Sequence, residues 1–291
     1  MPSMITHWLF AEKVEEKLGF GCSVSEKKMR LWGAQGPDIL FCHRTMPLKK
    51  KGESLSEYGH RMHTMPDPAP LIAALQQCEE EELGGALGRA WRQGFLCHYL
   101  LDRTCHPFVT ARARWLHEQL PVQPVSYCHQ EIEASLDTMM LRRETGQLPQ
   151  ERAVHGALPP LDDSEKEILA LHLERLIFAG FQIHVEKKRL YQVMSDASYA
   201  YHLATDKTGL KRMLTRRWER KKPWRISSRL LPMTEDPQWD HANLDHAVWG
   251  EKGEEDDFFA LYDRAVEESP AFFANYQTNC AEQVTAHIPF C

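Results

Sequence analysis

The sequence has no run of about 18 apolar residues, so no membrane-spanning helix is expected. Its beginning lacks the basic start, long apolar stretch and small-residue cleavage site of a secretory signal. The predicted location is therefore the cytoplasm. Cysteine is also scarce. Eight residues in 291, with no Cys-x-x-Cys pair, argue against a disulfide scaffold and against a zinc-finger-like thiolate site.

The sequence also lacks a large excess of one charge sign and the residue patterns typical of β-strands. The formal net charge is −6 with 26% charged residues, which gives the chain no overall attraction to nucleic acid or anionic lipid. Alternation of apolar and polar residues is missing, and so are the Asn-Gly and Asp-Gly turns of β-hairpins. The sequence therefore predicts an all-α protein.

The apolar periodicity predicts one helical domain over residues 1–291. Residues 1–145 contain the metal-ligand motifs, and residues 146–291 supply additional helices that complete the domain. Helices are expected from Ser164 onward, in at least two pieces, and over residues 4–18, 85–106, 125–143 and 256–282. Pro107 is expected to end the helix over residues 85–106. Residues 33–70, rich in Gly, Pro, Met and His, are expected to form a long loop.

Imidazole and carboxylate side chains recur at helical spacing in the most apolar segment. His98, Asp102 and His106 stand four residues apart, so on a helix they project from one face. Polar groups in such a run are costly unless they are paired or bind a metal. A hydrogen-bonded histidine is the alternative for each His alone. The three residues together favour a metal site.

A second motif repeats this spacing. His129 and Glu133 are four residues apart, and Asp137 continues the stripe. Two antiparallel helices with facing His and carboxylate stripes can build a metal site between them. Imidazole and carboxylate ligands suit zinc, and also manganese or iron.

Further candidates lie upstream. His7 falls in the N-terminal helix, Asp38 follows a Gly-Pro pair, and His60 and His63 lie in the predicted loop. Each alone is more typical of a structural role, since Asp38, for example, can stabilise a turn through its own backbone.

Four cysteines directly precede histidines, which indicates either a mixed Cys/His metal site or small buried residues beside the ligand face. The second interpretation is preferred, because neighbouring residues on a helix point about 100° apart. These cysteines are Cys42, Cys97, Cys105 and Cys128.

The motifs, in this order, resemble the zinc-dependent phospholipase C family of bacteria, whose superfamily also contains zinc-dependent single-strand nucleases. The segment Thr6–Phe10, Thr-His-Trp-Leu-Phe, resembles the start of the branch of that family that lacks signal peptides. The likeness covers roughly residues 4–140 and continues weakly into residues 240–249 and the helix after them.

The resemblance implies a multi-helix bundle with a zinc cluster between its helices. His63 matches the family's loop histidine better than His60 does. The secreted phospholipases of that family bind a third zinc through an N-terminal Trp exposed by leader cleavage, and the spacings around His106 differ from theirs. The resemblance therefore implies two zinc ions, or three if His7 replaces that Trp. By this likeness the ligands divide among three sites: Asp38, His63, His98 and Asp102; His106, His129 and Glu133; and His7 with Asp102.

The function implied is zinc-dependent, phospholipase C-like hydrolysis of a phosphodiester. Water activated by the metals would attack phosphorus in line. Asp38 would orient or deprotonate that water, whereas Glu133 would be a ligand and not the base. Two alternatives stay open: a single-strand nuclease-like phosphodiesterase, and a metal-binding protein without enzyme activity. The helical His-Asp phosphohydrolases are set aside, because no His in the chain is followed by Asp.

Two segments bear on the substrate. Residues 207–229 are strongly basic and contain Trp218 and Trp224. They predict either a contact with anionic lipid or nucleic acid, or simply a solvated helix face and loop. A phospholipase also needs apolar surface beside its site, for which the predicted loop offers Leu40, Phe41, Met46, Met62 and Met65.

Overall fold

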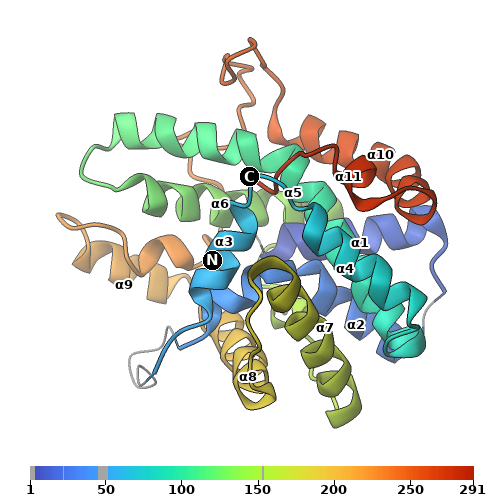
Figure 1. Ribbon diagram of the computed structural model, residues 1–291. Helices are drawn as coiled ribbons and strands as arrows, with labels where there is room; N and C mark the ends of the chain where they lie inside the picture. The colour runs from blue at the N-terminus through green and yellow to red at the C-terminus, as the bar shows by residue number, and fades with distance from the viewer. Residues whose placement is uncertain (1–3, 22, 45–51, 153) are drawn as a thin grey trace.

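The computed structural model describes residues 4–21, 23–44, 52–152 and 154–291. Within these ranges the chain forms helices and no β-strand, which confirms the predicted all-α class (Figure 1). None of these helices has both the length and the apolarity to cross a membrane. The α-helices are α1 Met4–Leu18, α2 Val24–Ala34, α3 Ser56–His63, α4 Ala69–Glu80, α5 Gly85–Gln119, α6 Val125–Thr145, α7 Asp163–Phe181, α8 Lys187–Ala204, α9 Leu210–Trp218, α10 Phe258–Thr278 and α11 Ala281–Thr285, and the 3₁₀ helices are η1 Gly36–Cys42, η2 Val154–Ala157 and η3 Ser227–Arg229.

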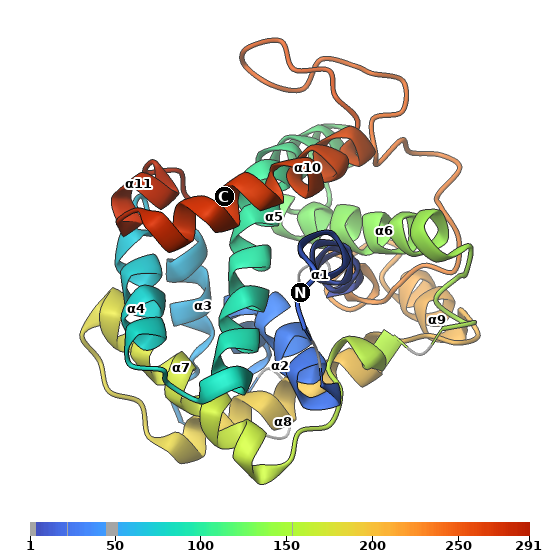
Figure 2. The same ribbon diagram turned by 90° about the vertical axis from the view of Figure 1, so that its right-hand side faces the viewer.

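Helix α5 has 35 residues and runs through the middle of the molecule (Figure 2). It contacts α1, α2, α6, α7 and α10, which come from both halves of the chain. Its Trp91, Phe95 and Phe108 belong to a hydrophobic cluster that extends along the chain from Met4 to Phe290. The two halves therefore share this cluster, and the single domain over residues 1–291 stays a prediction.

Helix α5 continues past Pro107, so the prediction that it ends there is wrong. Proline in a helix interior costs about 3 kcal/mol, because it lacks an amide hydrogen and crowds the carbonyl four residues before it. The turns after Pro107 bury Phe108, Val109 and Leu116, and burial of each such side chain contributes roughly 1.5–3 kcal/mol. Tertiary packing outweighs the local cost, and the helix continues beyond His106 to Gln119.

The expected loop over residues 33–70 is also largely helical where the structure describes it. Ala34 ends α2, and η1 and α3 follow before α4 begins at Ala69. Segments of this length are too short to show a helical apolar period in the sequence. The consequence for the site is direct, since η1 and α3 contact each other and hold Asp38 and His63.

Helices α2 and α5 cross with their backbones in contact. A Cβ atom on Gly33 would overlap the carbonyl oxygen of Trp91, and one on Gly94 would overlap that of Arg30. Only glycine allows two helices to approach this closely. The crossing brings the last residue of α2, Ala34, beside α5.

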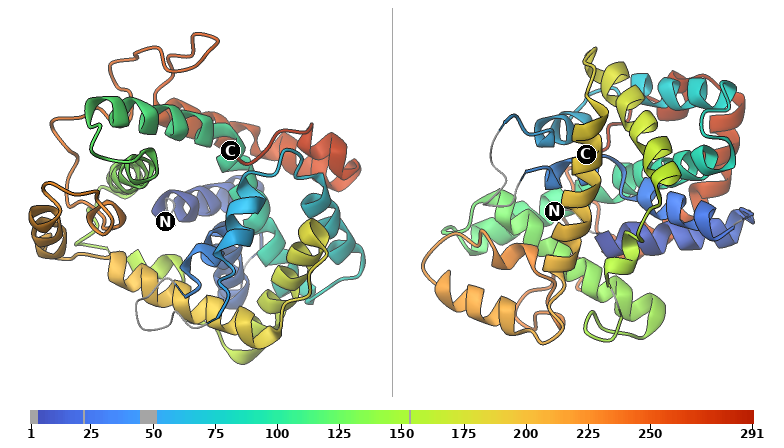
Figure 3. Two further views of the ribbon diagram at one scale, coloured as in Figure 1. Left: turned by 60° about the vertical axis from the view of Figure 1, so that its left-hand side comes forward. Right: turned by 90° about the horizontal axis from the view of Figure 1, so that it is seen from below.

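Helices α5 and α6 lie side by side, and α1 packs against both (Figures 1 and 2). The stripes of His and carboxylate residues on α5 and α6 therefore face a common region that α1 also borders. Helix α9 lies at the edge of the molecule, away from this region (Figure 3). Helices α1, α6 and α10 lie at or within a few residues of their predicted bounds, and α7 begins one residue before Ser164, capped by Asp162.

Candidate metal centre

All eight predicted ligands converge from five helical elements. The ligand atoms fall into three groups, and within each group they lie within 4.8 Å of one another. Each group could hold a metal ion. Because the first two share His98, we call them together the inner site, and the third is the outer site. The groups are His7, His98 and Asp102; Asp38, His63 and His98; and His106, His129 and Glu133.

The carboxylate of Asp102 lies at the centre of the inner site. Its Oδ2 is 3.1 Å from Nε2 of His98 and 3.6 Å from Nε2 of His63. Its Oδ1 is 3.3 Å from Nε2 of His7. The Oδ1 of Asp38 lies 2.9 Å from Nε2 of His63. One carboxylate thus faces three imidazole nitrogens from three different helices.

Backbone carbonyls fix the orientation of two of these rings. The Nδ1–H of His98 donates to the carbonyl oxygen of Ala34 at 3.0 Å, and that of His63 donates to Gly59 at 2.7 Å. When Nδ1 of a neutral imidazole donates, Nε2 presents its lone pair. Both lone pairs point toward carboxylate oxygens. This is the hydrogen-bonding pattern that surrounds metal-ligating histidines.

Several buried nitrogen and oxygen atoms of the inner site have no hydrogen-bond partner and could instead bind a divalent cation. Nε2 of His98 and both oxygens of Asp38 are buried without a hydrogen-bond partner, although Oδ1 of Asp38 lies 2.9 Å from Nε2 of His63. Ligands of a tetrahedral ion, bound at about 2.0–2.1 Å, lie about 3.3 Å from one another. The four N···O separations here range from 2.9 to 3.6 Å. The residues present therefore fit a metal ion.

The electrostatics of the inner site favour positive charge. Burial alone would lower the pKa of His63, but the carboxylate of Asp38 raises it to about 9. Burial likewise opposes the charge on Asp102, yet His98 and His7 hold the pKa of that carboxyl well below its usual range. In the absence of a metal, protons on His63 and His7, whose pKa values are, despite burial, both raised by the neighbouring carboxylates, would supply the charge that these carboxylates attract.

The outer site is more open and has a different charge balance. Nε2 of His129 lies 3.1 Å from Oε1 of Glu133, and the rings of His106 and His129 have centroids 4.8 Å apart. Burial and the neighbouring His129 lower the pKa of His106 to about 4. His106 is thus a neutral ring at pH 7, as a metal ligand must be.

A cavity of about 20 Å³ lies between the two sites. Its walls include His7 and Asp102 of the inner site and His106 and Glu133 of the outer site. A space of this size holds about one water molecule. The two sites are therefore neighbours across a single small cavity.

Comparison with known protein families, with curated proteins and with solved structures finds no match to this chain. The likeness to the phospholipase C family therefore rests on the quoted motifs alone, and the geometry of the site has to carry the functional argument.

Asp137 does not join the metal ligands, although it continues the spacing of His129 and Glu133. Its carboxylate accepts hydrogen bonds from the backbone amides of Ile5 and Thr6 and from the Thr6 hydroxyl. Asp137 thereby holds the first turn of α1, which carries His7.

Several other candidates lie outside the three groups. His60 is exposed, whereas His63, three residues later, is buried in the inner site. In the weakly similar segment, His241 is buried beside Ser135 and His246 is exposed. The four cysteines that precede histidines are buried and belong to no group, as the preferred interpretation expected, and burial raises the pKa of their thiols: Cys42, Cys97, Cys105 and Cys128.

Two residues that sequence reasoning missed shape the inner site. Phe290 is fully buried, with its ring centroid 5.6 Å from that of His63 and 6.0 Å from that of His98. Gly36 has a φ of +52°, and a Cβ atom there would lie 2.5 Å from the ring of His98. The Gly-Pro pair was a signal for Gly36, but nothing in the sequence linked Phe290 to His98 and His63, which lie more than 190 positions earlier.

The predicted apolar rim is only partly present. Leu40 and Met62 are fully buried in the core, so they offer no surface. Phe41 and Met65 are half-buried, and the Phe41 ring centroid lies 5.3 Å from that of His63. Met46 lies outside the described residues.

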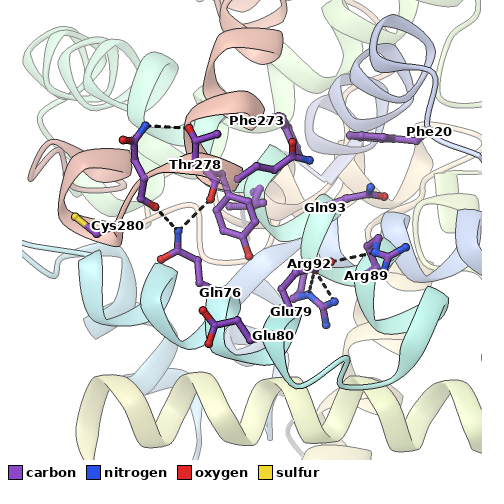
Figure 4. A pocket seen from close by; sticks show the side chains of 14 residues that line it. Phe20, Gln76, Glu79, Glu80, Arg89, Arg92, Gln93, Phe273, Thr278 and Cys280 are labelled. Atoms are coloured by element: carbon purple, nitrogen blue, oxygen red, sulfur yellow. Dashed lines mark hydrogen bonds and ion pairs between the residues drawn. The ribbon is translucent and has the colours of Figure 1, made fainter.

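A larger pocket of about 490 Å³ lies among α4, α5 and the end of α10 (Figure 4). None of the eight candidate ligands lines it. Its polar groups satisfy one another, since Glu79 accepts hydrogen bonds from Arg89 and Arg92, and Gln76 donates to the carbonyl oxygen of Tyr276. We therefore place the candidate chemistry at the inner and outer sites.

Proposed function

We propose that this chain is a cytoplasmic, zinc-dependent phosphodiester hydrolase of the phospholipase C type. One observation carries the proposal: two buried groups of ligands share His98, and a third group of ligands lies across one small cavity. Sites with several metals a few ångströms apart are suited to phosphodiester cleavage. Bound ions would acidify water, hold the phosphate oxygens and stabilise the leaving alkoxide.

Asp38 is the residue proposed to position the attacking water and accept its proton. Burial opposes its charge, but His63 and His98 lower its pKa below the ordinary value, so the carboxylate is ionised at neutral pH. Its Oδ1 faces His63, and Oδ2 has no hydrogen-bond partner. An ionised oxygen without a donor can accept a proton. Glu133 already faces His129, which supports its role as a ligand.

The difference in exposure suggests the direction of substrate approach. His98 is completely buried, whereas the side chain of His129 is 24% exposed. A substrate phosphate would therefore arrive from the outer site. The burial of the inner site favours a different function, a closed metal site without catalysis, because structural sites leave no open coordination position.

Metal content tests the proposal first. The protein, purified without chelator and reloaded with zinc, should contain two or three zinc equivalents by elemental mass spectrometry. His98→Ala should lose most of them, because His98 belongs to both inner groups. His60→Ala is the matched control, since it removes an exposed imidazole outside the groups and should keep full metal content. No stoichiometric metal in the reloaded parent protein would overturn the proposal.

Turnover tests the chemistry separately. The zinc-loaded protein should hydrolyse bis(p-nitrophenyl) phosphate, and Asp38→Asn should reduce turnover at least a hundredfold with the fold intact by circular dichroism. Comparison of phosphatidylcholine with single-stranded DNA then distinguishes a phospholipase from a nuclease. Full metal content without hydrolysis of any of these substrates would support the closed, non-catalytic site instead.

A further inference from the structure

Helix α9 has an unusual surface, because none of its residues is buried. Four large apolar side chains are half exposed or more: Leu210 at 50%, Met213 at 58%, Leu214 at 54% and Trp218 at 61%. Their spacing of three, one and four residues puts them on a single face of the helix. We call this face the apolar stripe of α9.

The opposite face of α9 forms ion pairs with helix α6. Arg212 and Arg216 both pair with Glu131 of α6, whose side chain is only 3% exposed. These arginines are two and six positions after Leu210, which places them on the far side from the apolar stripe. The attachment therefore leaves the stripe directed outward, at the edge of the molecule seen in Figure 3.

Residues 207–229 contain ten Lys or Arg and one acidic residue, a formal charge of +9 in a chain whose net charge is −6. The single acid, Glu219, is buried and accepts hydrogen bonds from the backbone amides of Ile226 and Ser227. Among the described residues, four of the exposed cations of this segment form no ion pair: Arg217, Arg220, Lys221 and Arg225. The apolar stripe is thus bordered by positive charge that the protein itself does not neutralise.

The combination of an exposed apolar stripe and unpaired cations matches the chemistry of an anionic lipid surface. Helices that lie in a membrane interface insert an apolar face at the acyl boundary and keep basic side chains at the headgroups. Single-stranded nucleic acid would need free aromatic faces for base stacking. Here Lys222 lies 4.4 Å over the ring of Trp218 and Arg216 lies 3.6 Å over that of Trp224, while the rest of the stripe is aliphatic. A second copy of the chain would bring like charges together.

We propose that the apolar stripe of α9 and the basic residues around it dock this protein reversibly on anionic phospholipid membranes. The inference does not depend on the metal centre, because no candidate ligand lies in residues 207–229. Docking of this kind would add to the proposed function, because it brings the protein to a membrane whose phospholipids are themselves phosphodiesters.

Vesicle sedimentation tests the docking, with the experiment run both with and without chelator so that metal chemistry cannot produce the result. The parent protein should sediment with vesicles containing phosphatidylglycerol at least tenfold more than with phosphatidylcholine vesicles. Leu214→Gln with Trp218→Gln should abolish most of this binding. Arg217→Gln with Lys221→Gln should weaken it at least tenfold, because each basic residue near such a surface contributes about a fivefold change.

The matched control is Val24→Gln with Val122→Gln, which removes two side chains exposed by 80% and 63% outside α9. It should bind like the parent protein. Circular dichroism should be unchanged in every variant, since all the altered side chains are exposed. Absence of parent binding, or equal binding by the Leu214/Trp218 variant, would overturn the proposal. Tighter capture of single-stranded DNA that survives the loss of Trp218 would overturn it in favour of nucleic acid.

Discussion

The Nδ1–H of His98 donates a 3.0 Å hydrogen bond to the carbonyl oxygen of Ala34, the last residue of α2. Ala34 reaches this position because Gly33 and Gly94 allow the backbones of α2 and α5 to touch. The bond turns Nε2 of His98 toward Asp102. Loss of such a supporting contact typically costs ten- to a hundredfold in metal affinity. A helix crossing thus determines the geometry of the inner site.

Gly36→Ala should weaken metal binding at the inner site about tenfold or more. Its backbone has a φ of +52°, and the new methyl group would lie 2.5 Å from the His98 ring, which would have to move. Zinc affinity measured by competition with a chromophoric chelator checks this. Gly19→Ala is a suitable control, because Gly19 has a φ of +64° but no atom within 4 Å of the added Cβ. Equal affinity losses in both variants would show that the effect is only backbone strain.

Metal-free protein should lose stability as the pH rises from about 6.5 to about 9. Burial opposes the charge on His63, but Asp38 raises its pKa to about 9, against about 6.5 in an unfolded chain. A raised histidine pKa stabilises the folded state fully below the unfolded value, and this stabilisation disappears as the pH passes the folded value. Its full size is on the order of 3 kcal/mol.

Urea unfolding of the chelator-treated protein across this pH range is the measurement. His63→Gln should flatten the dependence, and His60→Gln should keep it. An unchanged slope in His63→Gln would mean that other groups control the titration.

The spacing of His98, Asp102 and His106 was enough to predict a shared helix face, but not the division into two sites. Eight residues along a helix produce a rotation of about 80°, so His106 turns away from His98 toward α6. Which partners it meets there depends on the packing of α6, for which the sequence has no local signal. The choice of His63 over His60 came from the family resemblance, and the structure places His63 in the inner site.

Asp137 shows the limit of reasoning from spacing. It follows Glu133 by four residues, as Glu133 follows His129. Asp137 differs from the ligands because its carboxylate accepts hydrogen bonds from the backbone amides at the start of α1, more than 130 residues away in the sequence. The short helices η1 and α3 were missed for a related reason. Their positions depend on contacts with each other and with α5 and α8, and not on an apolar period.

Pro107→Ala should stabilise the protein by about 1 kcal/mol or more. The substitution restores an amide donor for the carbonyl of Arg103 and removes the crowding that proline causes inside a helix. Pro107 is exposed, so no packing is lost. Unfolding in guanidinium chloride measures the change, and metal content should stay constant. A loss of stability would indicate that proline fixes a bend that the surroundings of His106 require.

Asp137→Ala should destabilise the protein by about 3 kcal/mol, because two buried amides and a hydroxyl lose their acceptor. The first amides of a helix have no partner within it, and here a carboxylate from α6 supplies one. The loss should also loosen His7, so the ion held with His7 should leave while the outer site keeps its metal. Urea unfolding and elemental mass spectrometry measure the two effects. Glu235→Ala, which removes a partly exposed carboxylate paired with Arg142, should cost less than 1 kcal/mol. If both variants lose the same stability, Asp137 does not act as the acceptor that positions α1.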